Sequence, residues 1–184
     1  MRNKLAFKVS LGGIVTAVCL FSMFCTGFLP MLDYTIPTFA GFLMVIMIVE
    51  TSTKWAVTTY AAVSFLCLLI TPNYQASLLF ILFMGYYPIL KFYLDRIKSR
   101  AASWTVKYIV FNAAASAFYL LFQFVFAGAD MLEGMEMFGK YAIMVMWLAA
   151  NAFFFIYDRL LGQLIDIYAV SYTHLRAHET ELHL

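Results

Sequence analysis

The stretch FMGYYPILKFYLDRIKSR, residues 83–100, begins as an apolar, aromatic run and ends in a cluster of basic side chains. The whole chain is similarly apolar: of its 184 residues, 64% are hydrophobic and 12% are charged. Soluble domains carry about 45–50% apolar and about 25% charged residues, so this composition excludes an ordinary soluble domain. It predicts an all-α integral membrane protein, because an open sheet would leave backbone groups unpaired in lipid.

The apolar runs predict six transmembrane helices. A helix needs about 20 apolar residues to cross a bilayer, and fewer where the bilayer is locally thinned. We expect residues 1–169 to form one transmembrane domain with spans at residues 9–29, 34–49, 55–70, 76–92, 106–127 and 141–160. The second and third spans are short for a full crossing. No internal repeat or separate soluble domain is visible.

The distribution of lysine and arginine predicts the orientation of these spans. Six crossings place both ends of the chain on the same side. Ten basic residues then share that side, whereas the opposite side receives Lys140 alone and the last one, Arg176, falls in the tail. The positive-inside rule therefore predicts that both termini are cytoplasmic and that the fourth span meets the cytoplasm at Lys91. The ten residues are Arg2, Lys4, Lys8, Lys54, Lys91, Arg96, Lys98, Arg100, Lys107 and Arg159.

Residues 170–184 form a tail that we expect to be artefactual or disordered. Residues 170–180 resemble the conceptual translation of an adapter used in preparing sequencing libraries, so the natural carboxyl terminus is expected to be lost. All three histidines lie in this tail, and His178 and His183 are five residues apart. His174 and His178 are four residues apart, but the segment that resembles a zinc-protease helix is HETELH, from His178 to His183. Because that motif needs its two histidines four residues apart, the match fails, and the tail does not predict a metal site.

Polar side chains follow one face of the fifth span. Tyr108, Asn112, Ser116, Tyr119 and Gln123 lie within a stripe about 80° wide on a helix. Polar groups on a buried helix face other helices or a cavity rather than lipid. Two interpretations stay open, a ligand pocket with Tyr119 and Gln123 near its outer mouth, or hydrogen bonds between helices.

The sixth span and two loops add further polar candidates. Asn151 is expected near mid-membrane, where it could pair with the fifth span across the bundle. Asp158 and Arg159 are expected to pair with each other or to face the membrane interface. In the outer loops, Asp33, Tyr34 and Gln75 could cover a pocket together with Asn73 and Tyr74, although aromatic rings at that depth also serve as interfacial anchors.

The sequence lacks the residue sets that several functions need. We find no phosphate-binding loop, no catalytic set and no clearly buried charge between the ends of the spans. We therefore expect no enzyme, no proton-coupled pump, no cofactor and no nucleic-acid partner. The three cysteines lie in or beside apolar runs without the spacing of metal ligands.

Three features together resemble the substrate-binding S components of energy-coupling factor (ECF) transporters. They are the basic amino terminus, the segment LGGIVTAV at residues 11–18, and the segment FLPMLDYTIPTFAGFL at residues 28–43 within a six-span chain. The resemblance implies a bacterial plasma-membrane subunit that captures a vitamin-like small molecule at its outer side. It also implies association with a coupling protein and ATPases formed by separate chains.

The resemblance further implies which residues act. It implies substrate binding by Asp33, Tyr34, Gln75, Tyr119, Gln123 and Asn151. Docking of the coupling protein is implied at Gly13 and Ala17, although the family usually has alanine at the first of these positions. The alternative is a membrane scaffold that resembles the six-helix rod-shape-determining proteins. Its basic loop from Lys91 to Lys107 would dock a cytoplasmic partner or anionic lipid.

Overall fold

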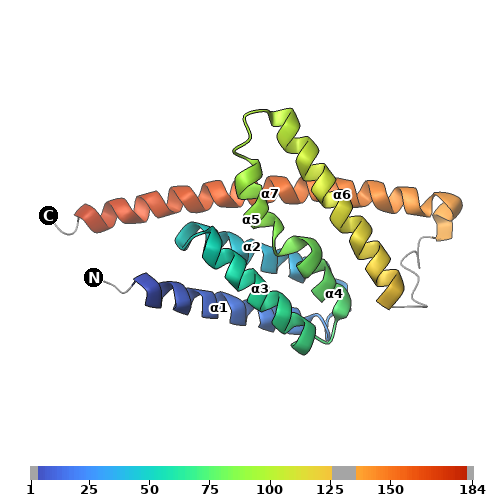
Figure 1. The fold of residues 1–184 in the computed structure, drawn as a ribbon, viewed down its shortest axis with the longest axis horizontal. Helices are drawn as coiled ribbons and strands as arrows, with labels where there is room; N and C mark the ends of the chain where they lie inside the picture. The colour runs from blue at the N-terminus through green and yellow to red at the C-terminus, as the bar shows by residue number, and fades with distance from the viewer. Residues whose placement is uncertain (1–3, 126–135, 182–184) are drawn as a thin grey trace.

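The fold is seen in a computed structural model that describes residues 4–125 and 136–181 (Figure 1). Every regular element in these two ranges is helical, which confirms the predicted all-α class. The long helices are α1 (Lys4–Cys25), α2 (Thr35–Glu50), α3 (Thr53–Ile70), α6 (Arg100–Val125) and α7 (Ala142–Glu181). Shorter elements are η1 (Pro30–Leu32), α4 (Tyr74–Leu79), η2 (Phe80–Met84), α5 (Tyr87–Leu94) and η3 (Glu136–Tyr141).

Each of the six expected spans overlaps a helical segment, although several ends differ, as in α1, which runs from Lys4 to Cys25 where residues 9–29 were expected. Five helical segments are long and apolar enough to cross a membrane, namely Leu5–Cys25, Thr53–Ile70, Tyr74–Leu94, Arg100–Phe124 and Met137–Tyr168. The sixth helix, α2, has only 16 residues, as the short second span predicted. It rises about 24 Å at 1.5 Å per residue. Residues 126–127 of the expected fifth span lie outside the described residues.

Helix α2 is the central element of the bundle. It packs against α1 and α3 on one side and against η2, α5 and α7 on the other, and seven of its residues are buried. The closest approach is at Gly41, where an added Cβ would lie 2.5 Å from the carbonyl oxygen of Met84 and 2.6 Å from the hydroxyl of Tyr157. Only a residue without a side chain leaves room for this contact between α2, η2 and α7.

The fourth span is helical throughout but changes its winding in the middle. Residues of α4 lead into a π-helical turn, η2, in which the amide of Gly85 donates to the carbonyl oxygen of Phe80 at 2.8 Å. The wider turn leaves carbonyl groups open to side chains from other helices. The hydroxyl of Tyr60 in α3 donates to the carbonyl of Ile81 at 2.6 Å, and the hydroxyl of Tyr157 in α7 donates to that of Met84 at 3.3 Å.

An aromatic cluster joins the fourth span to α6 and α7. Phe154 is fully buried and stacks on Phe111 of α6, with ring centroids 4.6 Å apart and planes 9° apart. Phe83 and Tyr87 contact the edge of the same ring. This packing sets the place where α5, α6 and α7 cross (Figure 1).

Helix α7 continues far beyond the expected sixth span. Its backbone is helical to Glu181, whereas we expected residues 170–184 to be artefactual or disordered. Residues 170–181 therefore continue the backbone helix of α7, and the expectation that this tail is artefactual stays a prediction. Residues 182–184 lie outside the described part of the chain. The start of α1 and the end of α7 lie at the same end of the molecule (Figure 1).

Candidate functional site

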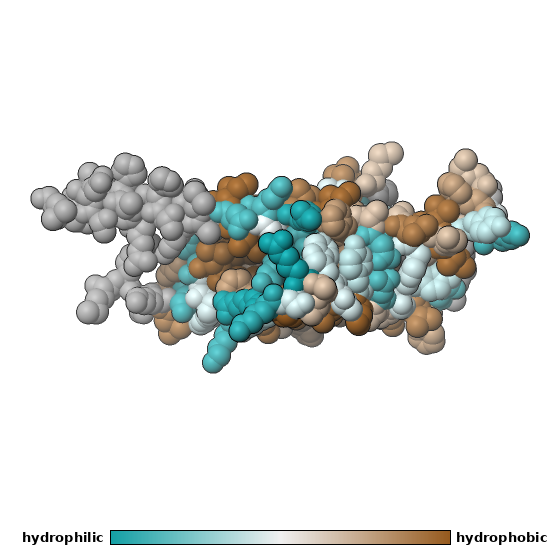
Figure 2. Space-filling view, turned by 90° about the horizontal axis from the view of Figure 1, so that it is seen from above, coloured by the Kyte–Doolittle hydropathy of each residue, from teal (hydrophilic) through white to brown (hydrophobic). Residues whose placement is uncertain are grey.

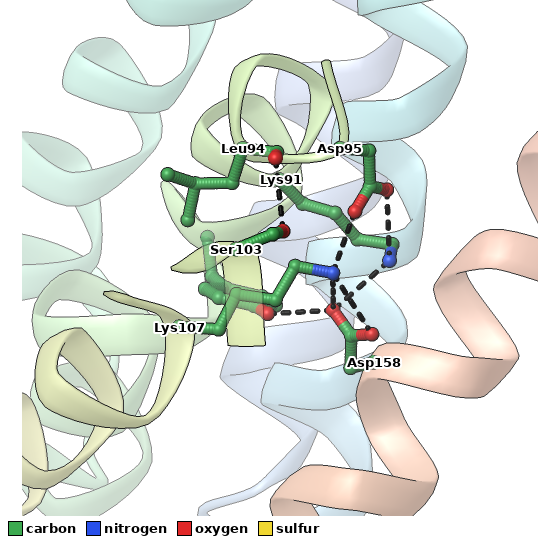
Figure 3. Close-up of polar contacts among 7 residues, drawn as sticks. Lys91, Leu94, Asp95, Ser103, Lys107 and Asp158 are labelled. Atoms are coloured by element: carbon green, nitrogen blue, oxygen red, sulfur yellow. Dashed lines mark hydrogen bonds and ion pairs between the residues drawn. The ribbon is translucent and has the colours of Figure 1, made fainter. Parts of the chain in front are cut away.

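Four charged side chains and one tyrosine meet where α5, α6 and α7 cross, and we call this group the charged cluster (Figure 3). Asp158 of α7 is its centre. Its carboxylate lies 2.9 Å from the ammonium of Lys91 and 3.1 Å from that of Lys107, and it accepts a hydrogen bond of 2.6 Å from the hydroxyl of Tyr87. Asp95 completes the cluster at 3.0 Å from Lys91 and 2.6 Å from Lys107.

The charged cluster is mostly withdrawn from solvent. Asp158 is 2% exposed, and Lys91 and Lys107 are each 3% exposed, whereas the side chain of Asp95 is 43% exposed. Two ammonium groups balance two carboxylates, so the cluster is neutral as a whole. Burying charges costs several kcal/mol per ion, and only close pairing of the kind seen here offsets that cost.

These contacts correct two predictions made from the sequence. Asp158 does not pair with Arg159, whose guanidinium instead lies 5.0 Å from the ring centre of Phe155. Buried charge is present within the spans, although we expected none, and Lys91 is buried where we expected it to mark the cytoplasmic boundary. The signal in the sequence was the charge inside three apolar runs, at Lys91, at Lys107 and at Asp158 beside Arg159. Intramembrane charges of this kind are expected to pair.

A cavity of about 560 Å³ opens beside the charged cluster, and we call it the basic-end cavity. Its lining includes the four charged residues of the charged cluster, together with Arg100, Trp104, Arg159 and Asp166. Figure 2 views the molecule from the side of the α5–α6 connection and shows hydrophilic side chains gathered near the middle of this face, among hydrophobic ones. The cavity can therefore offer cations to a polar ligand.

The candidate residues in the loops bond to one another. Asn73 donates to the carboxylate of Asp33 at 2.8 Å, and Gln75 donates to the hydroxyl of Tyr34 at 3.0 Å. Asn73 also caps α4 by accepting a hydrogen bond from the amide of Ala76 at 3.1 Å. Partial burial raises the pKa of the Asp33 carboxyl, and the hydrogen bond from Asn73 opposes that shift. The two loops thus form one polar surface, the loop end of the molecule.

The polar stripe of α6 makes the predicted contact with α7. The side-chain amides of Asn112 and Asn151 bond reciprocally, at 3.0 Å and 3.3 Å, which confirms the expected pairing across the bundle. Farther along α6, Gln123 donates to the hydroxyl of Tyr119 at 3.2 Å. In the described part of the chain, no hydrogen bond joins Tyr119, Gln123 or Asn151 to the candidate residues at the loop end.

A second cavity, the α6–α7 cleft, lies between these two helices and has a volume of about 500 Å³. Tyr119 and Asn151, two of the expected substrate-binding residues, line it together with Trp147 and Lys140. Methionine and aliphatic side chains of α7 complete its wall. The lining of this cleft comes from Tyr119 of α6, Lys140 of η3 and residues of α7.

The expected docking residues lie on an open face of α1. Gly13 and Ala17 are exposed, and a Cβ added to Gly13 would meet nothing within 4 Å. Gly12 instead faces the bundle, because a Cβ there would lie 3.4 Å from the hydroxyl of Thr59. Among the described residues, no group of three histidine, cysteine, aspartate or glutamate side chains could hold a metal ion.

Comparisons with known proteins add no family assignment, so the class of this protein is defined by its fold and composition alone. No protein-family model, no curated protein and no solved structure matches the chain. The chain is an all-helical protein in which five helices are long and apolar enough to cross a membrane.

Proposed function

We propose that the protein spans the bacterial plasma membrane six times, with both termini and the α5–α6 connection in the cytoplasm. The outward side chains of its helices support insertion, because large apolar groups such as Phe21, Phe65 and Phe124 are 65–85% exposed. Soluble proteins rarely expose apolar surface on this scale. The short α2 fits the same arrangement, since its buried position lets neighbouring helices cover its ends.

We further propose that the protein is the substrate-capture subunit of an uptake transporter of the ECF type. The observation that carries this proposal is the α6–α7 cleft, in which Tyr119, Trp147 and Asn151 offer two aromatic rings and an amide. Its volume of about 500 Å³ lies in the range of about 300–1,000 Å³ that is usual for small-molecule sites. Aromatic walls with few polar groups suit a flat heterocyclic molecule such as a vitamin.

The open face of α1 supports the same proposal. Gly13 and Ala17 offer a small-residue surface on which another helix could pack closely, as small residues do between membrane helices. A transporter of this type takes its energy from ATPases in separate chains, and this surface would receive the coupling protein that links them to the capture subunit.

The test is to purify the tagged full chain from its host and identify any copurifying small molecule by mass spectrometry. We expect one heterocyclic compound, bound by the unaltered protein and lost from the variant Tyr119→Ala. Leu120→Ala is the matched control, because Leu120 neighbours Tyr119 in the chain but is 66% exposed and does not line the cleft. If the variant Tyr119→Ala retained the compound, the α6–α7 cleft would not be its binding site.

One observation favours the scaffold as the second candidate. At the loop end, Asp33 and Gln75 already have partners in Asn73 and Tyr34, so these groups do not converge on a free cavity. A scaffold would copurify with cell-wall enzymes, whereas a capture subunit would copurify with a membrane coupling protein and ATPases. Affinity purification with the partners identified by mass spectrometry distinguishes the two functions.

A further inference from the structure

We propose that the basic-end cavity binds the phosphate headgroup of an anionic phospholipid. The inference goes beyond substrate capture and shares only the premise of membrane insertion with it. The cavity is lined by four cations and three carboxylates, and this excess of one positive charge favours an anion. The cations are Lys91, Arg100, Lys107 and Arg159.

The partners of these charges decide which of them can meet a ligand. Asp95 and Asp158 each accept both lysines, so those carboxylates and ammonium groups compensate one another within the charged cluster. The two arginines have no such compensation, since no carboxylate of the described residues lies within 4 Å of either guanidinium. Arg100 and Arg159 are therefore the groups that would bind phosphate, for which the guanidinium fork is well suited.

Aromatic rings position one of these arginines. The guanidinium of Arg159 lies 5.0 Å from the ring centre of Phe155 and 6.0 Å from that of Trp104, which also lines the cavity. Trp104 itself stacks on Phe155, with centroids 5.5 Å apart. An arginine held against aromatic rings keeps its hydrogen-bond donors free at the edge, so the side chain is ordered before a phosphate arrives.

An apolar groove adjoins the cavity and points to a lipid rather than a free anion. The groove has a volume of about 460 Å³ and runs along α6 past Trp104, Tyr108 and Ile109. Trp104 lines both the groove and the basic-end cavity. A polar cavity that continues into an apolar groove matches the two parts of a phospholipid, a charged headgroup and an acyl chain. Basic pockets between membrane helices on the cytoplasmic side commonly hold such headgroups.

The test measures lipid binding to the purified, delipidated full chain by native mass spectrometry. Phosphatidylglycerol is compared with phosphatidylcholine, and glycerol phosphate serves as the headgroup without acyl chains. We expect bound phosphatidylglycerol and weak binding of the other two. The double variant Arg100→Gln/Arg159→Gln should weaken phosphatidylglycerol binding about 10- to 30-fold, because each basic residue near a lipid surface contributes about 1 kcal/mol.

The matched control is Lys54→Gln/Lys98→Gln, which removes the same charge from exposed residues that do not line the cavity. Equal weakening by both double variants would overturn the proposal in favour of unspecific attraction by surface charge. Equal binding of glycerol phosphate and phosphatidylglycerol would overturn it in favour of a free-anion site. No preference over phosphatidylcholine would also contradict it. The small-molecule test at Tyr119 uses another cavity, so either proposal can fail alone.

Discussion

At the scale of single residues, Gly41 is a position with little room for change. A Cβ there would lie 2.5 Å from a backbone oxygen of η2, which cannot move aside as a side chain could. We predict that Gly41→Ala destabilises the protein by about 1–3 kcal/mol, the usual cost of overpacking a core. Unfolding of the purified protein in mixed micelles, followed by circular dichroism, measures the change.

Gly13→Ala is the matched control for this prediction. Gly13 also lies in a helix, but its surroundings are open. Alanine is favoured over glycine in a helix by about 1 kcal/mol, so this variant should be as stable as the unaltered protein or more stable. Equal destabilisation by the two substitutions would contradict the close contact of α2 with η2 and α7.

Asp158 is the single acceptor that holds both buried lysines and Tyr87. Asp158→Ala would leave two ammonium groups buried with only the half-exposed Asp95 between them. Removing one partner from a buried ion pair costs about 3–5 kcal/mol, and we predict a loss of that size in the same unfolding measurement. Asp166→Ala, on the same helix and the same cavity, should change stability little because Asp166 is exposed.

A second substitution separates lost charge balance from lost packing. In Asp158→Ala/Lys107→Met, one lysine and one carboxylate of the charged cluster remain, and they form the existing pair of Lys91 with Asp95 at 3.0 Å. The double variant should therefore recover part of the lost stability. If it is less stable than Asp158→Ala alone, charge balance is not what holds the crossing together.

At the scale of elements, α1 presents two different faces. One face packs against α2 and α3, whereas the face with Gly13 and Ala17 is open. We predict that Gly13→Leu/Ala17→Leu leaves the fold intact but lowers copurification of the coupling protein and ATPases at least tenfold. Ala61→Leu, an exposed small residue of α3, is the control that should leave copurification unchanged. If the double variant copurified with the coupling protein and ATPases as well as the unaltered chain does, α1 would not be the docking surface.

The elements also show what a sequence can and cannot predict. Apolar runs predicted every long helix, and the polar residues of the last two spans predicted that Asn151 pairs with α6, although not that its partner is Asn112. The charged cluster was missed because its members are 67 and 51 residues apart in the chain, from Asp158 to Lys91 and to Lys107. Hydropathy cannot distinguish a paired lysine from a solvated one near the end of a span.

The same limit applies to η2 and to the candidate substrate-binding residues. The carbonyl groups of the π-helical turn accept hydrogen bonds from the hydroxyls of Tyr60 and Tyr157, which come from other helices. The candidate substrate-binding residues form two separate groups, one at the loop end and one at α6 and α7. This separation likewise follows from the way in which the helices cross. Such tertiary relations have no periodic signal in the sequence.

At the scale of the whole molecule, the exposed basic residues and the loop end are the features that bear on its orientation. Lys54, Lys98 and Arg100 are exposed, so they still support the positive-inside prediction although Lys91 and Lys107 are buried. Both proposals assume insertion in this orientation, which would place the α6–α7 cleft toward the exterior and the basic-end cavity toward the cytoplasmic lipid surface.

Cysteine accessibility in intact cells tests this claim most directly. Full-length Tyr74→Cys and Lys98→Cys variants are treated with a membrane-impermeant maleimide before and after permeabilisation, with the unaltered chain as background. Both positions are exposed, and they lie at the loop end and in the α5–α6 connection. We predict labelling of Tyr74→Cys in intact cells and of Lys98→Cys only after permeabilisation. Labelling of Lys98→Cys in intact cells would contradict the account.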